Sequence, residues 1–365
     1  MFLVILLAVL LRLPIAFANK SRPPLVHEDK YTWQQKGSEK FVWLHQDATN
    51  AELEALSDQQ DITSLRMWGM RSGAPGPFIT DDGLRYIQKM EQLKALGLSG
   101  LNITDDGLQH ISGLRNLQTL DLAMTKITDK GLAHLSRLEN LQELRLDFLP
   151  ITDAGVVHLK NMTKLKVLRF YGAPITDKGL ENLQDMRELE NLQLGRALIT
   201  DNSMPLIGKM TKLKTLDLRT RVTDEGLVHL SSLSELSWLA LSDTAVGDKG
   251  IAHIAGLRKL EWLYLEGTKV TDAGIKKIAG LPKLNTLYLS RISITDQGLD
   301  SIATLTNLER LKLNETQVTD RGLKKLRRLK QLRYLELYNT KTSSEGIDDL
   351  KAAIPKLRII VHRNY

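Results

Sequence analysis

The sequence feature that most constrains the fold is a repeated motif of the form Ile-Thr-Asp-x-Gly-Leu, which recurs through most of the 365 residues. Its Thr position is occupied in turn by Thr80, Thr104, Thr128, Thr152, Thr176, Thr200, Thr223, Gly247, Thr271, Thr295, Thr319 and Ser343. Successive positions are 24 residues apart, except for the 23 residues between Thr200 and Thr223. A repeat of this length predicts an array of stacked units rather than a single globular core.

Two hydrophobic periods follow each other within every repeat. Leucines spaced by three residues from Leu132 to Leu141 predict a helix with one buried side, and the alternation from Leu141 to Leu146 predicts a short strand. Neither element can bury its apolar side alone, so successive turns must stack. We therefore expect an α/β solenoid of about 12–13 turns, with a parallel β-sheet on the concave face and α-helices on the convex face.

Both ends of the array are degenerate. A turn beginning at Thr49 contains an excursion with the sequence Gly-Ala-Pro-Gly-Pro, and Phe41 and Trp43, helped by Trp33, are expected to close the core before it. After Ser343 the last turn lengthens and ends in a final strand. The predicted organisation is an N-terminal segment and cap at 19–48, the solenoid at 49–342, and a terminal repeat with a C-terminal cap at 343–365.

The pattern LxxLxLxxTxITDxGLxxL resembles the leucine-rich repeat proteins over roughly residues 41–365. It is similar to the 24-residue subclass, akin to the cysteine-containing repeats, that occurs in F-box substrate adaptors and in exported bacterial proteins. The resemblance implies a horseshoe that binds a protein or a glycan on its concave face. It does not identify the ligand.

The repeated polar residues favour structural roles. The Thr and Asp of each motif lie just before a helix, where their oxygens can accept backbone N–H groups and the negative charge suits the helix dipole. A calcium ladder is the less favoured alternative. Five of the eight histidines share one position on the outer helices, which we interpret as a habit of the repeat: His110, His134, His158, His229 and His253. No metal site and no cofactor are expected.

The first 18 residues predict a secretory signal. An apolar run from Phe2 to Leu11 is followed by Ala16-Phe17-Ala18, a small-x-small cleavage site. No Lys or Arg precedes the run and Arg12 interrupts its end, so a retained anchor and a misassigned start stay as alternatives. A cleaved signal peptide at residues 1–18 predicts an exported protein, whether periplasmic, secreted or at the cell surface.

Residues that do not repeat are the best indicators of function, because they are not needed by the scaffold. In each strand three positions face the concave side: the residue before the second Leu, the residue between the paired Leu, and the residue after the last Leu. We call these the first, second and third columns. Nine Trp or Tyr residues lie between Thr49 and Ile360, and eight of them fall on these columns: Trp68, Tyr171, Trp238, Trp262, Tyr264, Tyr288, Tyr334 and Tyr338.

The aromatic residues concentrate in the C-terminal half of the array. Neighbouring parallel strands are only ~4.8 Å apart, so Trp238, Trp262, Tyr264 and Tyr288 should form one patch. Aromatic anchors with a charged rim are typical of a binding hot spot. The predicted ligand-binding residues are Trp238, Trp262, Tyr264, Glu266, Tyr288, Arg310, Lys312, Tyr334, Glu336 and Tyr338. The alternative is solvated strand decoration, since aromatic residues also suit strands.

Two charged features add weaker predictions. Arg145, Arg169, Tyr171 and Arg219 extend the concave surface as a secondary binding stretch. The formal charge of +7 has a local source between Arg321 and Arg333, which carry seven positive residues and no acid. There, Lys324, Lys325, Arg327, Arg328 and Lys330 face outward. They form either a solvated helix face or a contact with an anionic surface, and nucleic acid is not expected to be that partner.

The sequence contains no catalytic motif such as Gly-x-Ser-x-Gly or His-Glu-x-x-His, no phosphate-binding glycine loop, and no cysteine. The regularly placed Ser, His and Asp residues already have structural explanations. We therefore predict a binding or scaffold protein and not an enzyme. The alternatives are an intracellular substrate adaptor resembling F-box proteins and a structural surface or adhesion element.

Overall fold

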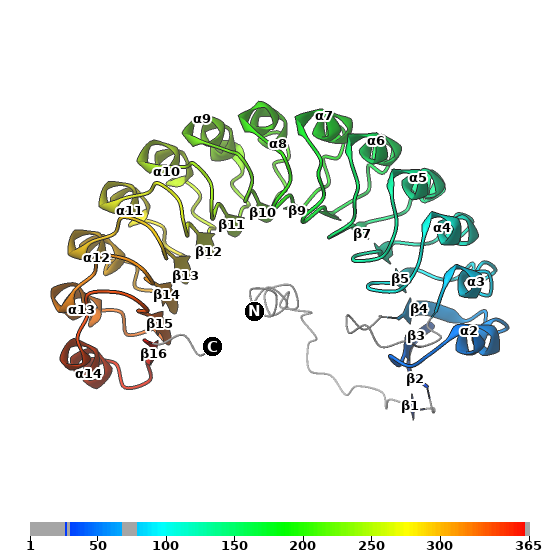
Figure 1. Cartoon of the computed structure of the whole chain (residues 1–365), viewed down its shortest axis with the longest axis horizontal. Helices are drawn as coiled ribbons and strands as arrows, with labels where there is room; N and C mark the ends of the chain where they lie inside the picture. The colour runs from blue at the N-terminus through cyan, green and yellow to red at the C-terminus, as the bar shows by residue number, and fades with distance from the viewer. Residues whose placement is uncertain (1–25, 28–29, 68–78, 362–365) are drawn as a thin grey trace.

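The computed structural model describes residues 26–27, 30–67 and 79–361. The chain forms an open horseshoe with strands along its inner side and helices along its outer side (Figure 1). The predicted signal segment, Trp68 and the Gly-Ala-Pro-Gly-Pro excursion lie outside the described residues. Within them, none of the helices is long and apolar enough to span a membrane.

A single sheet follows the order of the sequence from β1 to β16. Strands β1 (Val26–His27) and β2 (Tyr31–Lys36) are antiparallel, as are β2 and β3 (Glu39–Leu44), and from β3 onward all pairs are parallel. The parallel strands that follow are β4 (Ile62–Arg66), β5 (Ala95–Gly97), β6 (Thr119–Asp121), β7 (Glu143–Arg145), β8 (Val167–Arg169), β9 (Asn191–Gln193), β10 (Thr215–Asp217), β11 (Trp238–Ala240), β12 (Trp262–Tyr264), β13 (Thr286–Tyr288), β14 (Arg310–Lys312), β15 (Tyr334–Glu336) and β16 (Arg358–Ile360).

The outer layer consists of short helices. They are α2 (Asn50–Leu56), α3 (Asp81–Leu84), α4 (Asp105–Ile111), α5 (Asp129–Leu132), α6 (Asp153–Val156), α7 (Asp177–Leu180), α8 (Met204–Ile207), α9 (Asp224–Leu227), α10 (Asp248–Ile254), α11 (Asp272–Ile278), α12 (Asp296–Ile302), α13 (Asp320–Leu326) and α14 (Ser344–Ala353). In the middle of the array 3-10 helices accompany them: η1 (Ala133–Arg137), η2 (Val157–Leu159), η3 (Glu181–Leu183), η4 (Asp201–Ser203) and η5 (Val228–Ser232). Leucines spaced by three residues suit this geometry, because a 3-10 helix has three residues per turn.

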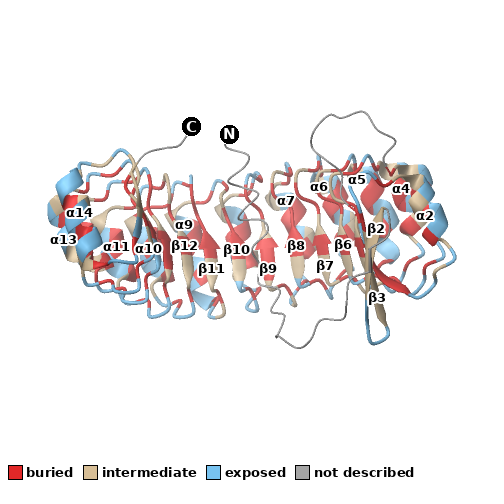
Figure 2. Ribbon diagram, turned by 90° about the horizontal axis from the view of Figure 1, so that it is seen from below, coloured by how far each residue is buried: buried red, intermediate tan, exposed pale blue. Residues whose placement is uncertain are grey.

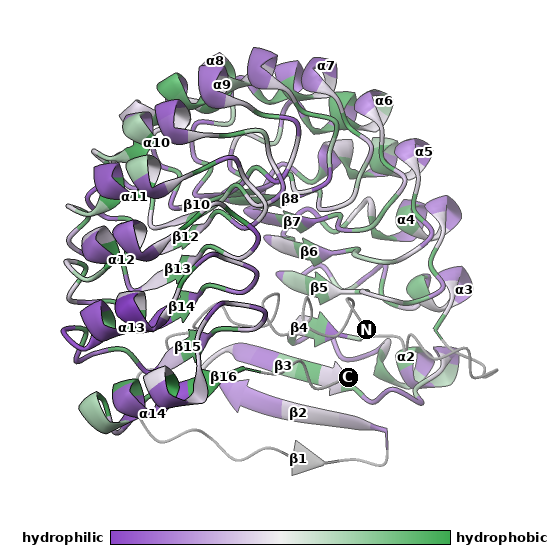
Figure 3. Cartoon of the chain, turned by 60° about the vertical axis from the view of Figure 1, so that its left-hand side comes forward, coloured by the Kyte–Doolittle hydropathy of each residue, from purple (hydrophilic) through white to green (hydrophobic). Residues whose placement is uncertain are grey.

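The repeated apolar residues form one continuous core between the two layers. Leu132, Leu135 and Leu138 on the helical side and Leu144 and Leu146 on the strand side are all completely buried. Figure 2 shows this buried interior and the exposed outer sides of the helices. Much of the surface of α11, α12 and α13 is hydrophilic (Figure 3). The predicted α/β solenoid is therefore confirmed.

The motif's Thr and Asp have different roles, which corrects part of the capping prediction. Thr128 accepts a backbone N–H of its own helix α5, as predicted. Asp105, however, bonds to the following turn, where its carboxylate accepts the backbone N–H of Thr128 at 2.7 Å and the Thr128 hydroxyl at 2.6 Å. The same pair of bonds joins most successive turns. These aspartates, here called the Asp ladder, therefore join neighbouring repeats through hydrogen bonds.

The Asp ladder also explains the motif's glycine. A Cβ on Gly107 would come within 2.3 Å of Oδ1 of Asp81, the ladder residue of the preceding turn. Ser203 replaces this glycine in one turn and donates its hydroxyl to Oδ1 of Asp177 at 2.5 Å, so that a clash becomes a hydrogen bond.

Candidate functional site

The strand register places the non-repeating residues in the expected columns. Trp238 pairs with Trp262 in the first column, and Tyr264 pairs with Tyr288 in the second. Tyr288 is followed in its column by Lys312. Strands β11 to β15 and the third-column residues after them, here called the aromatic stretch, therefore present one surface to the concave side.

The rings of the aromatic stretch contact each other across columns. Trp238 lies against Tyr264 with ring centroids 5.1 Å apart, and Tyr264 meets Tyr288 edge to face at 4.9 Å. The ammonium of Lys312 lies 4.4 Å from the centroid of the Tyr288 ring. Each such ring pair contributes about 0.5–1.5 kcal/mol to stability, in addition to the contribution from the buried apolar area. The result is a continuous series of contacts over four strands, in which Trp238 touches the diagonal Tyr264.

The series ends in a polar group at β14 and β15. Lys312 forms an ion pair with Glu336 at 3.2 Å. The same carboxylate accepts hydrogen bonds from the hydroxyl of Tyr334 and from the side-chain amide of Asn314, which also accepts the backbone N–H of Tyr338. Glu336 is therefore held by three neighbours, whereas Arg310 in the first column is exposed.

Burial changes the protonation behaviour of this surface. It raises the pKa of Tyr264 to about 12, and the nearby Tyr288 adds to the effect. Burial also raises the pKa of Tyr288 and that of Glu266, although Lys312 and Arg291 oppose the rise at Glu266. Both tyrosines stay neutral near pH 7, and their hydroxyls can serve as hydrogen-bond donors.

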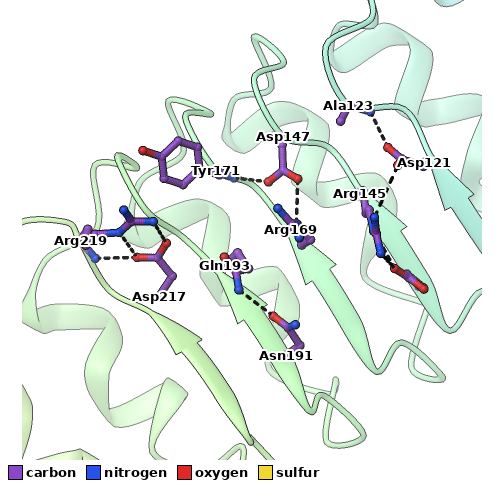
Figure 4. A network of polar contacts seen from close by, with 11 residues as sticks. Asp121, Ala123, Arg145, Asp147, Arg169, Tyr171, Asn191, Gln193, Asp217 and Arg219 are labelled. Atoms are coloured by element: carbon purple, nitrogen blue, oxygen red, sulfur yellow. Dashed lines mark hydrogen bonds and ion pairs between the residues drawn. The ribbon is translucent and has the colours of Figure 1, made fainter. Parts of the chain in front are cut away.

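Farther toward the N-terminus, strands β6 to β10 and the third-column residues after them, here called the central stretch, carry charges that pair internally (Figure 4). Arg169 donates to Asp147 at 2.7 Å, and only 6% of each side chain is exposed. Arg219 donates twice to Asp217, whose side chain is completely buried.

A third ionic group in the central stretch has two acids, because Arg145 lies 2.5 Å from Glu143 and 3.7 Å from Asp121. Burial raises the pKa of Asp121 and of Asp147 despite the arginines beside them. The pKa of Arg219 is raised as well, because Asp217 outweighs the opposite effect of burial. The predicted secondary binding residues are thus part of a network that already satisfies most of its own charge.

Tyr171 belongs to this network and is nearly buried. Its ring meets Phe148 edge to face at 5.1 Å, and the guanidinium groups of Arg196 and Arg219 lie 5.6 and 5.1 Å from its centroid. A Cβ on Gly195 would come within 2.7 Å of the Tyr171 ring, so the glycine makes room for it. Sequence reasoning treated all column residues as solvent-facing. The structure differs because large side chains on strands ~4.8 Å apart cover one another.

Two aromatic residues of the N-terminal cap were also misplaced by sequence reasoning. Phe41 and Trp43 are only partly buried, while Val42 and Leu44, which alternate with them, face the core. Phe41 pairs with Ser64 and Trp43 with Arg66, so both continue the concave columns, and their rings stack at 6.1 Å. The alternation of the strand was the available signal. Trp33 packs partly against the core, as predicted.

The basic segment after Arg321 is less free than its sequence suggests. Lys325 pairs with Asp300 at 2.7 Å, and Arg327 pairs with Asp349 at 2.9 Å. Lys330 donates to the backbone carbonyl of Ala353. Lys324 and Arg328 are exposed, and no ion pair involves them in the described residues.

Histidines and acidic residues do not gather into a possible metal centre. No group of three or more metal-binding side chains occurs in residues 30–67 and 79–361. The five patterned histidines lie on the outer helical side, where His134, His229 and His253 are exposed.

Comparison with solved structures supports the fold. An internalin from Listeria monocytogenes is similar with a TM-score of 0.63 and 24% identity, over 87% of this chain and 90% of that one. A leucine-rich repeat protein from Leptospira interrogans is similar with a TM-score of 0.53 and 18% identity, over 86% of this chain and 95% of that one. No curated protein matches the sequence significantly.

Two family models match parts of the chain. Residues 199–362 match the model described as a leucine-rich repeat region, and residues 113–136 match a model described as a leucine-rich repeat. Neither is an enzyme family. The horseshoe, its strand register and these matches together identify the fold of this chain as a leucine-rich repeat solenoid.

Proposed function

We propose that this chain is a non-catalytic binding protein whose aromatic stretch recognises a protein ligand. The observation that carries the proposal is the unbroken contact series from Trp238 through Tyr264 and Tyr288 to Lys312, on positions that the scaffold does not require. Partly exposed aromatic side chains on a rigid sheet lose little conformational entropy on binding, and they dominate the energetics of many protein interfaces.

A glycan is the second candidate ligand. Trp238, Trp262, Tyr264 and Tyr288 are partly exposed, and ring faces of this kind can also pack against a sugar. A structural surface or adhesion element is a third role, and self-association of the full chain would favour it.

We further propose that the protein is exported, with 1–18 as the cleaved signal, 19–48 as the N-terminal segment and cap, 49–342 as the solenoid and 343–365 as the terminal repeat and cap. Support comes from the apolar run and the Ala16-Phe17-Ala18 site. The competing assignment is an intracellular adaptor of the F-box type, as the motif subclass allows. N-terminal sequencing of the mature protein distinguishes the two, because an adaptor would keep its first residues.

The test of the binding proposal compares ligand capture by three full-length proteins. Three proteins are immobilised: the mature wild-type chain, a variant with Trp238→Ala, Trp262→Ala and Tyr264→Ala, and a control with Phe41→Ala and Trp43→Ala. Each is exposed to an extract of the compartment in which the mature protein is found. Partners are identified by mass spectrometry, and the thermal transition of each protein is recorded.

The proposal expects partners that are captured by the wild type and by the control, and that the triple variant loses while its thermal transition changes little. Equal capture by the triple variant would contradict it. Loss of capture in the N-terminal control alone would move the binding surface to the other end of the horseshoe.

A further inference from the structure

The carboxylate of Glu266 lies within the aromatic stretch without an internal partner. Glu266 lies just after β12, two residues beyond Tyr264 and on the same side of the sheet, and its charge helps to raise the pKa of Tyr264 and of Tyr288. Among the described residues no hydrogen bond or ion pair involves its side chain. A half-buried carboxylate has lost part of its hydration, so an unpaired one carries a free-energy cost.

The surrounding charges do not neutralise Glu266. The charged groups that act on it include the cations Lys312 and Arg291 and the anions Glu336 and Asp243. Arg219 also interacts with Glu266, but its guanidinium is held by Asp217. Each cation already has its own acid, because Lys312 pairs with Glu336 at 3.2 Å and Arg291 pairs with Asp243 at 2.9 Å. Among the described residues Glu266 therefore has no cation of its own, although the exposed Arg310 of β14 makes the formal charge of the aromatic stretch zero.

A second polar group beside Glu266 also lacks a partner. The hydroxyl of Ser290 is buried and has no hydrogen bond, and its residue is only 5% exposed. Ser290 follows Tyr288 by two residues, so the register of β12 and β13 places it next to Glu266 in the third column. Leaving a buried hydroxyl unsatisfied costs about 1–3 kcal/mol. Because the Ser290 Oγ atom is shielded from solvent, the accessible unpaired group of this column is the Glu266 carboxylate.

The aromatic rings favour a cation as the partner of this carboxylate. Lys312 already places its ammonium 4.4 Å from the Tyr288 ring, so the faces of these rings accept positive charge. A ring quadrupole and a carboxylate attract the same partner, and their combination is a general way to bind ammonium and guanidinium groups.

We propose that the aromatic stretch receives a lysine or arginine side chain of its protein ligand, with the Glu266 carboxylate as the counter-charge. This inference rests on the proposed function of the same surface, and it adds the chemical class of the anchor residue. A cation there gives the Glu266 carboxylate a partner, and an acidic anchor would be repelled by it.

The experiment uses a positional-scanning library of immobilised hexapeptides, acetylated at the N-terminus and amidated at the C-terminus, so that only side chains carry charge. The probe proteins are the full wild-type chain, Glu266→Gln, and the variant with Trp238→Ala, Trp262→Ala and Tyr264→Ala. Glu139→Gln removes the same charge from an exposed site far from the aromatic stretch and serves as the matched control.

The wild type and Glu139→Gln should retain peptides with Lys or Arg at a fixed position. Glu266→Gln should lose that preference by about tenfold or more, because the ligand cation would be left without its counter-charge. Wild-type binding without preference for Lys or Arg, undiminished preference in Glu266→Gln, or no peptide binding at all would overturn the inference. Peptide binding that has no cationic preference but is lost in the triple variant would overturn the cation alone and leave the proposed function standing. Binding that survives in the triple variant would overturn both.

Discussion

The central stretch and the aromatic stretch use the same scaffold in opposite ways. In the central stretch, buried acids and arginines pair with each other, as Asp147 does with Arg169 and Asp217 with Arg219. In the aromatic stretch, rings contact one another across strands, and the Glu266 side chain forms no hydrogen bond or ion pair with the other described residues. The columns are the same in both, so exposure to the concave side does not by itself create a binding surface. A surface is available to a ligand where its own groups leave one another unsatisfied.

The largest expected effect concerns the stability of the central stretch. Asp217→Ala removes a completely buried carboxylate and leaves Arg219 without its partner, so we expect a loss of about 3 kcal/mol in the free energy of unfolding. Urea denaturation followed by circular dichroism measures it. Ligand capture by the folded protein should not change. A loss of capture without a loss of stability would reverse the roles given to the two stretches.

A smaller effect is expected on ligand affinity, and it should differ between aromatic residues at the two ends of the concave face. Trp262→Ala should weaken binding of the captured partner by about 30-fold, equivalent to roughly 2 kcal/mol, as for an interface hot spot. Trp43→Ala removes an equally large concave ring and should leave the affinity unchanged. Isothermal titration calorimetry with the purified partner provides both values, and equal losses would mean that the ligand spans the whole horseshoe.

Acid should weaken binding at the aromatic stretch. The pKa of Glu266 is raised by burial, so its carboxyl takes up a proton at a higher pH than an ordinary glutamate. The charged form binds the ligand cation, and protonation removes that charge. The affinity for a Lys-containing hexapeptide should therefore fall as the pH drops through this raised pKa, by up to about tenfold per pH unit. Fluorescence titrations across pH measure it, with Glu266→Gln as the control that should show a flat profile.

Substitutions in the Asp ladder, which joins successive turns, should lower stability and leave ligand binding unchanged. Hydrogen bonds from Ser203 and Thr200 overcome the effect of burial and lower the pKa of Asp177. A lowered folded pKa means that this stabilisation is present above the unfolded pKa and is lost as the pH falls through the folded value. Allowing for partial exposure, Asp177→Asn should cost about 1 kcal/mol near pH 7. Thermal unfolding across pH should show the difference from the wild type disappearing in acid.

The smallest effect is expected on the basic segment between Arg321 and Arg333, which includes most of α13. Lys324→Glu and Arg328→Glu change exposed cations without internal partners, so stability should stay within about 0.5 kcal/mol of the wild type. The same variants test the predicted anionic-surface contact. In sedimentation with vesicles containing phosphatidylserine, the contact predicts salt-sensitive binding by the wild type and weaker binding by the variants. Absence of binding by the wild type would contradict the contact.

Much of the fold could be predicted because each repeat contains the burial pattern of its own helix and strand. The three-residue spacing from Leu132 to Leu141 and the alternation to Leu146 each describe the burial of one element, and a constant period sets the register of the next. The columns of the concave face follow from the same alternation. The adjacency of Tyr264 and Tyr288 was therefore predictable, while the partners of Glu336, Asp147 and Asp105 were not.

The sequence by itself thus determined the stacking of the turns, the buried leucines and the positions that face the concave side, because each depends on spacing along one short segment. Only the tertiary structure decided which of those positions are available. The hydrogen bonds from Arg169 to Asp147, from Thr128 to Asp105 and from Tyr338 to Asn314 join residues 22 to 24 positions apart across neighbouring strands and turns. Whether Glu266 finds a partner depends on the same kind of contact. Those contacts compete with one another in space, and no local pattern records the outcome.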